Sequence, residues 1–91
     1  MNVVATISAS QPGKTLLFSG HQDTYPISNS AQCTVPALEG RLSDDDSRLY
    51  GRGAADMKGG IAAYIVAMRA LVDFIDAEDG TIVLAPAGDE E

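Results

Sequence analysis

The order of the apolar segments limits this chain to a small set of folds. Residues 15–19 (Thr-Leu-Leu-Phe-Ser) and 81–85 (Thr-Ile-Val-Leu-Ala) have the continuous apolar character of strands that are covered on both faces. Between them, residues 59–74 have the length and composition of a helix, with apolar residues around nearly the whole circumference. A strand, a helix and a strand in this order predict an α/β protein whose sheet has a parallel component.

The remaining segments are less regular. Residues 3–7 predict a further short strand, which a turn at residues 11–14 separates from the strand at 15–19. Residues 20–47 show no periodicity, and irregular segments of that length are usually functional or disordered. We expect the helix at 59–74 to pack against a sheet over most of its surface. Because 91 residues supply too few elements to flank and cover such a sheet, we also expect the chain to be incomplete.

Composition excludes several classes of protein. The hydrophobic content of 45% and the charged content of 21% are ordinary for a globular domain. A net charge of −7 argues against nucleic acid or an anionic membrane as a partner. The single cysteine, Cys33, excludes an internal disulfide. No basic segment followed by an apolar run begins the chain, so we expect a cytoplasmic location.

Ionisable side chains gather at the ends of the predicted elements. His21 and Asp23 follow one buried-type strand, Asp56 precedes the helix, and Glu90 and Glu91 follow the last strand. If the two strands are parallel neighbours, these groups converge on one edge of the sheet. An imidazole among several carboxylates is a reasonable divalent-metal site, and nitrogen plus oxygen ligation favours zinc. A bound cation would also relieve the repulsion between the carboxylates.

Each of these residues also has a simpler interpretation. A lone histidine in a loop is more often exposed or hydrogen-bonded than a metal ligand. Asp56, taken alone, is better explained as an N-cap that accepts backbone N–H bonds of the helix. Glu90 and Glu91 are compatible with a solvated acidic pair. The glycines around Lys58 suggest a phosphate loop, but their spacing does not fit and no hydroxyl residue follows the lysine.

Taken together, the motifs at residues 20–23, 51–60 and 88–91 are far more specific than any one of them. They stand as Gly20-His21-Gln22-Asp23, Gly51-Arg52-Gly53-Ala54-Ala55-Asp56-Met57-Lys58-Gly59-Gly60 and Gly88-Asp89-Glu90-Glu91. In this order the chain resembles, over residues 15–91, the zinc-dependent amidohydrolases and exopeptidases. That family includes acetylornithine deacetylase, succinyl-diaminopimelate desuccinylase, glutamate carboxypeptidase and aminoacylase. The resemblance implies a three-layer α/β/α sandwich, of which residues 1–91 would be the N-terminal part of the catalytic domain. The rest of that domain and a dimerisation domain would be absent.

The resemblance also implies a role for each acidic residue and the histidine. His21 would bind one metal ion, Asp56 would bridge two ions, and Glu91 would bind the second. Asp23 would orient the His21 ring, and Glu90 would be the general base that takes a proton from the attacking water. The implied cofactors are two divalent ions, zinc first, with cobalt or manganese as alternatives.

The implied activity is hydrolysis of the amide or peptide bond in a small N-acyl amino acid or peptide, as in deacetylases, desuccinylases and carboxypeptidases. The full-length protein would be a homodimer without nucleic-acid or membrane partners. Tyr25 departs from the family, which usually has valine there, and this departure concerns the substrate side of the site and not the metal side. Which acyl group is accepted stays open. Two alternatives also stay open: a non-catalytic metal-binding or interaction module of the same fold, and a nucleotide-binding domain.

Overall fold

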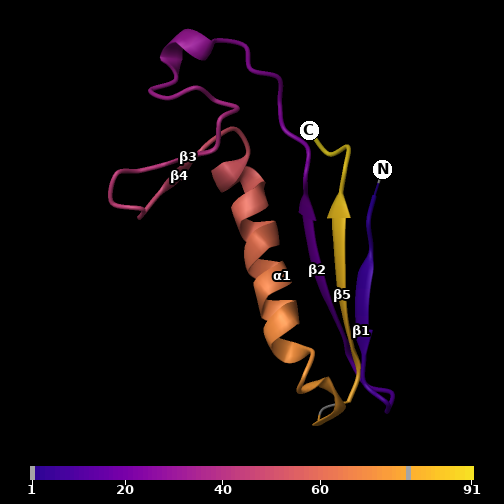
Figure 1. Ribbon diagram of the computed structural model, residues 1–91. Helices are drawn as coiled ribbons and strands as arrows, with labels where there is room; N and C mark the ends of the chain where they lie inside the picture. The colour runs from indigo at the N-terminus through magenta and orange to yellow at the C-terminus, as the bar shows by residue number, and fades with distance from the viewer. Residues whose placement is uncertain (1, 78) are drawn as a thin grey trace.

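The computed structural model describes residues 2–77 and 79–91, which form an elongated molecule of 54 × 32 × 15 Å. A three-stranded sheet in the order β1-β5-β2 has the helix α1 along one face, and a small hairpin is formed by β3 and β4 (Figure 1). The bounds of the elements are β1 Ala5–Ser8, β2 Thr15–His21, β3 Arg41–Leu42, β4 Leu49–Tyr50, α1 Gly59–Leu71 and β5 Thr81–Ala87.

The sheet is mixed. Strand β5 is central, pairing in parallel with β2 and antiparallel with β1. The parallel register runs from Thr15 opposite Thr81 to His21 opposite Ala87. The predicted α/β fold with a parallel component is therefore confirmed. Because β2 and β5 run in the same direction, the chain leaves both strands at the same edge of the sheet.

The core lies between β5 and α1. Ile82 and Leu84 of β5 are buried together with Met68 of α1. Alternate residues of a strand point to the same face, so Ile82 and Leu84 both contact the helix side. Phe18 of β2 adds a stacked contact with Tyr64 of α1, with ring centroids 4.8 Å apart. These contacts hold α1 against the strands that lead to the ionisable residues.

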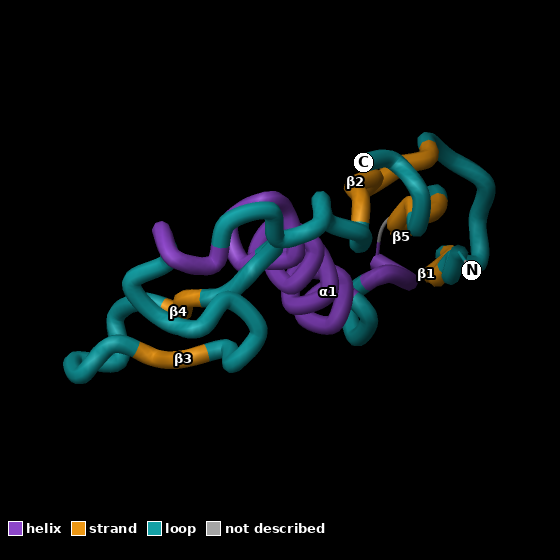
Figure 2. Tube along the Cα trace, turned by 90° about the horizontal axis from the view of Figure 1, so that it is seen from above, coloured by secondary structure: helices purple, strands orange, loops and turns teal. Residues whose placement is uncertain are grey.

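The expectation that α1 would be covered over most of its surface is wrong for the described residues. Ile65 and Val66 of α1 are 51% and 68% exposed, and Leu16 and Leu17 of β2 are 50% and 57% exposed. The physical reason is that α1 contacts the sheet along one face only. The β3–β4 hairpin lies on the other side of α1, near its N-terminal end (Figures 1 and 2). Strand β2 was expected to be covered on both faces, but the exposure of Leu16 and Leu17 shows that it is not. It is also an edge strand within the described part of the chain.

Residues 20–47 are largely irregular, as predicted, but the β3–β4 hairpin that begins within them was not predicted. Its turn is organised by Asp45, which accepts hydrogen bonds from the hydroxyls of Ser43 and Ser47. These bonds lower the pKa of Asp45 to about 2. Among the described residues, no helix has both the length and the apolar character needed to cross a membrane.

Candidate metal centre

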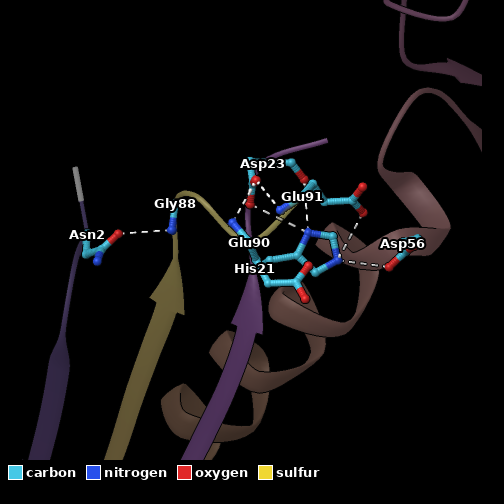
Figure 3. Close-up of polar contacts among 7 residues, drawn as sticks. All are labelled: Asn2, His21, Asp23, Asp56, Gly88, Glu90 and Glu91. Atoms are coloured by element: carbon cyan, nitrogen blue, oxygen red, sulfur yellow. Dashed lines mark hydrogen bonds and ion pairs between the residues drawn. The ribbon is translucent and has the colours of Figure 1, made fainter. Parts of the chain in front are cut away.

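Parallel pairing of β2 with β5 brings two of the predicted residues to one edge of the sheet. His21 is the last residue of β2 and is buried, at 8% exposure. The backbone N–H of Gln22 donates to the carbonyl of Ala87 at 2.7 Å, which continues the pairing just beyond His21. Glu91 lies four residues past the end of β5, with its side chain 11% exposed. The side chains of His21 and Glu91 consequently meet above the two strand ends (Figure 3).

Asp56 reaches the same place from a kinked turn, Ala54–Lys58, that precedes α1. The turn starts at Gly53, which is buried and has a left-handed backbone (φ 78°). A Cβ at Gly53 would lie only 2.6 Å from Cγ2 of Thr24, so glycine permits the close approach of this turn to the segment after β2. Gly20 likewise permits a close approach, because a Cβ at Gly20 would lie 2.5 Å from the Met57 side chain.

The interpretation of Asp56 as an N-cap is wrong. Helix α1 begins at Gly59, its N-cap is Lys58, and no side chain caps it. Asp56 itself has a non-helical backbone (φ −123°, ψ 100°) inside the kinked turn. Its side chain is 79% exposed and is directed to His21 rather than to the N–H groups of the helix (Figure 3). The kink therefore presents the Asp56 carboxylate to the strand ends.

Three ligand-type atoms converge in this arrangement. His21 Nε2 lies 3.0 Å from Asp56 Oδ1 and 3.7 Å from Glu91 Oε1. One ligand atom from each of the three residues lies within 4.8 Å of the others. The hydrogen bond with Asp56 raises the pKa of His21, while burial of the ring acts in the opposite direction.

The other ring nitrogen of His21 is fixed by Asp23. The backbone carbonyl of Asp23 lies 3.1 Å from His21 Nδ1, and because a carbonyl only accepts, Nδ1 donates. In the neutral imidazole, Nε2 then carries the lone pair that faces Asp56 and Glu91. A lone pair and two carboxylates can share this space only if a proton or a cation lies between them.

The carboxylate of Asp23 has a different partner. Its Oδ2 accepts hydrogen bonds from the backbone N–H groups of Glu90 and Glu91, each at 2.9 Å, and its Oδ1 lies 3.7 Å from His21 Nδ1. The bond from Glu91 N–H is the main reason that the pKa of Asp23 lies below its usual value. Asp23 thus ties the segment after β5 to the segment after β2. Glu90 is exposed and is held here through its backbone.

These residues fit a divalent cation. Glu91 Oε2 and Asp23 Oδ1 are buried without a hydrogen-bond partner among residues 2–77 and 79–91. A buried carboxylate oxygen without a partner is costly, and a cation would remove that cost at Glu91. One imidazole nitrogen and carboxylate oxygens form a ligand set typical of zinc and related ions.

A cavity of about 500 Å³ opens beside this cluster, with Asp56 and Glu91 in its wall. Tyr25, Tyr50 and Arg52 also line it. Sequence analysis assigns no role in the site to these three residues. Tyr25 stands out in the sequence only as a departure from the family, and Arg52 only as part of a motif. Tyr25 and Tyr50 lie in or next to the irregular region, where no periodicity indicates which side chains face a common space.

Comparison with known proteins agrees with the fold and the motifs. A sequence model described as "Peptidase family M20/M25/M40" matches residues 17–91. The chain belongs to this family. The resemblance found in the sequence is thereby confirmed.

Relatives within the family include succinyl-diaminopimelate desuccinylase of Rhodospirillum centenum, 44% identical over 79 residues, which cover 87% of this chain and 20% of the relative. A probable succinyl-diaminopimelate desuccinylase of Staphylococcus aureus is 40% identical over 91 residues, or 99% of this chain and 21% of the relative. A solved M20 family metallo-carboxypeptidase, Sso-CP2 of Sulfolobus solfataricus, superposes with a TM-score of 0.80 at 26% identity, covering 98% of this chain and 20% of that one. The chain thus spans about a fifth of the length of these family members.

Proposed function

We propose that the complete protein carrying this chain is a metal-dependent hydrolase that cleaves the amide or peptide bond of a small N-acyl amino acid or peptide. Residues 1–91 would form the N-terminal part of its catalytic domain. The observation that carries the proposal is the convergence of His21, Asp56 and Glu91 beside an open cavity. Relatives named as a desuccinylase and a metallo-carboxypeptidase support the same class of reaction.

In this proposal, His21, Asp56 and Glu91 hold two divalent ions, zinc first, with cobalt or manganese as alternatives. When bound, such ions polarise a carbonyl oxygen and lower the pKa of water. Asp56 would serve both ions, and its exposed carboxylate, with one of its two oxygens facing His21, supports this role. Three side chains do not complete two coordination shells, so further ligands would come from outside residues 1–91.

Glu90 is the proposed general base. It would accept a proton from the attacking water and pass the proton to the leaving amine, which needs a carboxylate near the reacting atoms that is not itself a ligand. Its exposed side chain and its backbone bond to Asp23 support this role. Asp23 would act through others, by fixing the Nδ1 side of His21 and by holding the backbone of Glu90 and Glu91.

The test uses the complete protein, stripped of metal by a chelator and then reloaded with zinc. Release of free amine would be measured for N-acetyl amino acids, N-succinyl amino acids and dipeptides. We expect hydrolysis to disappear with the metal and to return with zinc. Hydrolysis that survives full metal removal would contradict the proposal. Tight zinc binding without turnover of any compound would favour the non-catalytic module. The cytoplasmic location and the homodimer stay predictions.

A further inference from the structure

The cavity beside the metal centre contains charged residues of both signs. Asp56 and Glu91 are its acidic residues, and Arg52 is the basic residue in the described part of its wall. At about 500 Å³, the cavity is within the range of small-molecule sites. Tyr25 and Tyr50 add two aromatic walls, which supply apolar contact area and hydroxyl groups.

The backbone of Arg52 is held by a hydrogen bond, whereas its guanidinium forms no ion pair with the described residues. The Arg52 N–H donates to the carbonyl of Ala37 at 2.7 Å, and the next residue, Gly53, is buried. Arg52 is exposed, and within residues 2–77 and 79–91 its side chain forms no ion pair. Arg52 lines the same cavity wall as Asp56 and Glu91 but forms an ion pair with neither. Both carboxylates therefore stay available to the metal centre.

This charge distribution indicates what the part of the cavity beside Arg52 can bind. If cations neutralise Asp56 and Glu91, Arg52 remains as an unpaired positive charge in a partly enclosed space. A guanidinium presents a planar set of donors that matches a carboxylate with two parallel hydrogen bonds. An anchored backbone lowers the entropy that such a contact costs.

We propose that Arg52 is a specificity-determining residue that binds a carboxylate of the substrate. The site then selects substrates that carry this carboxylate over those that lack it. This inference rests on the proposed function, because it takes the Asp56 and Glu91 end of the cavity as the reacting end. The carboxylate has two possible sources, the far end of a dicarboxylic acyl group or the α-carboxylate of the amino acid.

The kinetic test compares Arg52→Gln with Arg48→Gln in the complete, zinc-loaded protein. Arg48 is a matched control, since it is an exposed arginine in the turn of the β3–β4 hairpin, away from the cavity wall. The substrates are an N-succinyl amino acid, its N-butanoyl analogue, whose acyl group carries no charge, and the α-amide of each. We expect Arg52→Gln to lower kcat/KM about 10- to 100-fold, mainly through KM, for substrates that carry the recognised carboxylate. Substrates without it should be little affected, and the pairs show which carboxylate Arg52 binds.

A binding measurement keeps the inference independent of turnover. Calorimetry would compare binding of the N-succinyl amino acid to Glu90→Gln protein with and without Arg52→Gln, and Arg52→Lys would test a charge that lacks the planar donor set. We expect weaker binding in Arg52→Gln and an intermediate affinity in Arg52→Lys. If no compound is hydrolysed but Arg52→Gln still weakens binding, the proposed function fails and the inference stands. The inference is overturned if Arg52→Gln protein keeps its zinc content and near-UV dichroism and its kcat/KM falls equally for substrates with and without each carboxylate.

Discussion

The backbone carbonyl of Asp23 determines which nitrogen of His21 is available to the metal centre. By accepting from Nδ1, it leaves Nε2 to face Asp56 and Glu91. The Asp23 carboxylate accepts hydrogen bonds from the backbone N–H groups of Glu90 and Glu91. Asp23 therefore positions one candidate ligand, His21, through its main chain and another, Glu91, through its side chain.

We expect Asp23→Asn to weaken zinc binding about 10- to 100-fold in the complete protein without abolishing it. The amide oxygen can still accept from Glu90 and Glu91, but it lacks the negative charge that strengthens both bonds. Asp23→Ala should weaken zinc binding further, because no side-chain acceptor remains for the N–H groups of Glu90 and Glu91. Zinc affinity would be measured by competition with a chromophoric chelator. Equal affinities in wild type, Asp23→Asn and Asp23→Ala would show that the Asp23 carboxylate has no part in the site.

Glu90→Gln should lower kcat by about 10²–10⁴ or more while leaving zinc content nearly intact. Glutamine keeps the shape of the side chain but cannot accept the proton of the attacking water. Asp89→Asn is the matched control, because it removes a neighbouring exposed carboxylate by the same chemical change. The measurements are steady-state kinetics and zinc per chain. A near-normal kcat in Glu90→Gln would exclude this residue as the general base.

A candidate site residue could be predicted from the sequence when it lies near the end of a regular element. His21 ends one apolar strand and Glu91 lies four residues past another, and parallel pairing brings such positions together, so both were accessible to prediction. Asp56 was recognisable as part of its motif, but the kink that turns its side chain away from α1 was not. Arg52 and Tyr25 line the cavity through the folding of irregular segments, for which the sequence carries no periodic signal.

At the level of elements, the turn Ala54–Lys58 connects the β3–β4 hairpin to α1 and brings the Asp56 side chain next to His21 at the end of β2. It depends on Gly53, whose left-handed backbone and lack of a Cβ bring the turn against Thr24. The backbone N–H of Lys58 closes the turn by donating to the carbonyl of Gly53 at 2.8 Å. A local change at Gly53 should therefore be transmitted to the metal centre.

Gly53→Ala should destabilise the complete protein by more than Gly40→Ala. Both glycines have a left-handed backbone, with φ 78° and φ 66°, so each substitution costs about 1–2 kcal/mol of backbone strain. Only at Gly53 would the new Cβ also collide with Thr24, whereas at Gly40 it would meet nothing within 4 Å. Denaturant unfolding and zinc affinity would both be measured. Equal losses of stability in the two variants, with unchanged zinc affinity, would show that the close approach at Gly53 does not position Asp56.

Elements with a clear apolar pattern were predictable, and their surroundings were not. The strands at β2 and β5 and the helix at α1 were each expected within a few residues of their observed bounds. Strands β3 and β4 have two residues each, which is too short for an alternating pattern to be visible. The continuous apolar character of α1 suggested coverage on all sides, but pattern alone does not say which neighbour supplies it.

At the scale of the whole molecule, exposed apolar surface is the dominant feature. Val66 of α1 and Leu17 of β2 are more than half exposed, and β2 has an unpaired edge within the described part of the chain. Such surfaces favour association with other strands and apolar faces. They support the proposal that residues 1–91 belong to a larger catalytic domain.

Residues 1–91 expressed alone should therefore aggregate, lack a cooperative thermal transition and show no hydrolysis of N-acyl amino acids. Zinc should not rescue the fold, because metal binding stabilises a fold only where the ligand set is nearly complete. Near-UV dichroism, thermal melting and light scattering would be recorded with and without zinc. A soluble, cooperatively melting and catalytically active 91-residue protein would rule out the proposed larger domain.

The central claim is that His21, Asp56 and Glu91 together hold the metal, and zinc content in an Asp56 variant tests it most directly. Zinc per chain would be measured by mass spectrometry after equilibrium dialysis of the complete protein as wild type, Asp56→Ala and Asp73→Ala. Asp73 is an exposed aspartate just beyond α1 and serves as the control. We expect two zinc ions per chain in wild type and Asp73→Ala, with loss of zinc and of hydrolysis in Asp56→Ala. Full zinc occupancy in a correctly folded Asp56→Ala protein would contradict the claim.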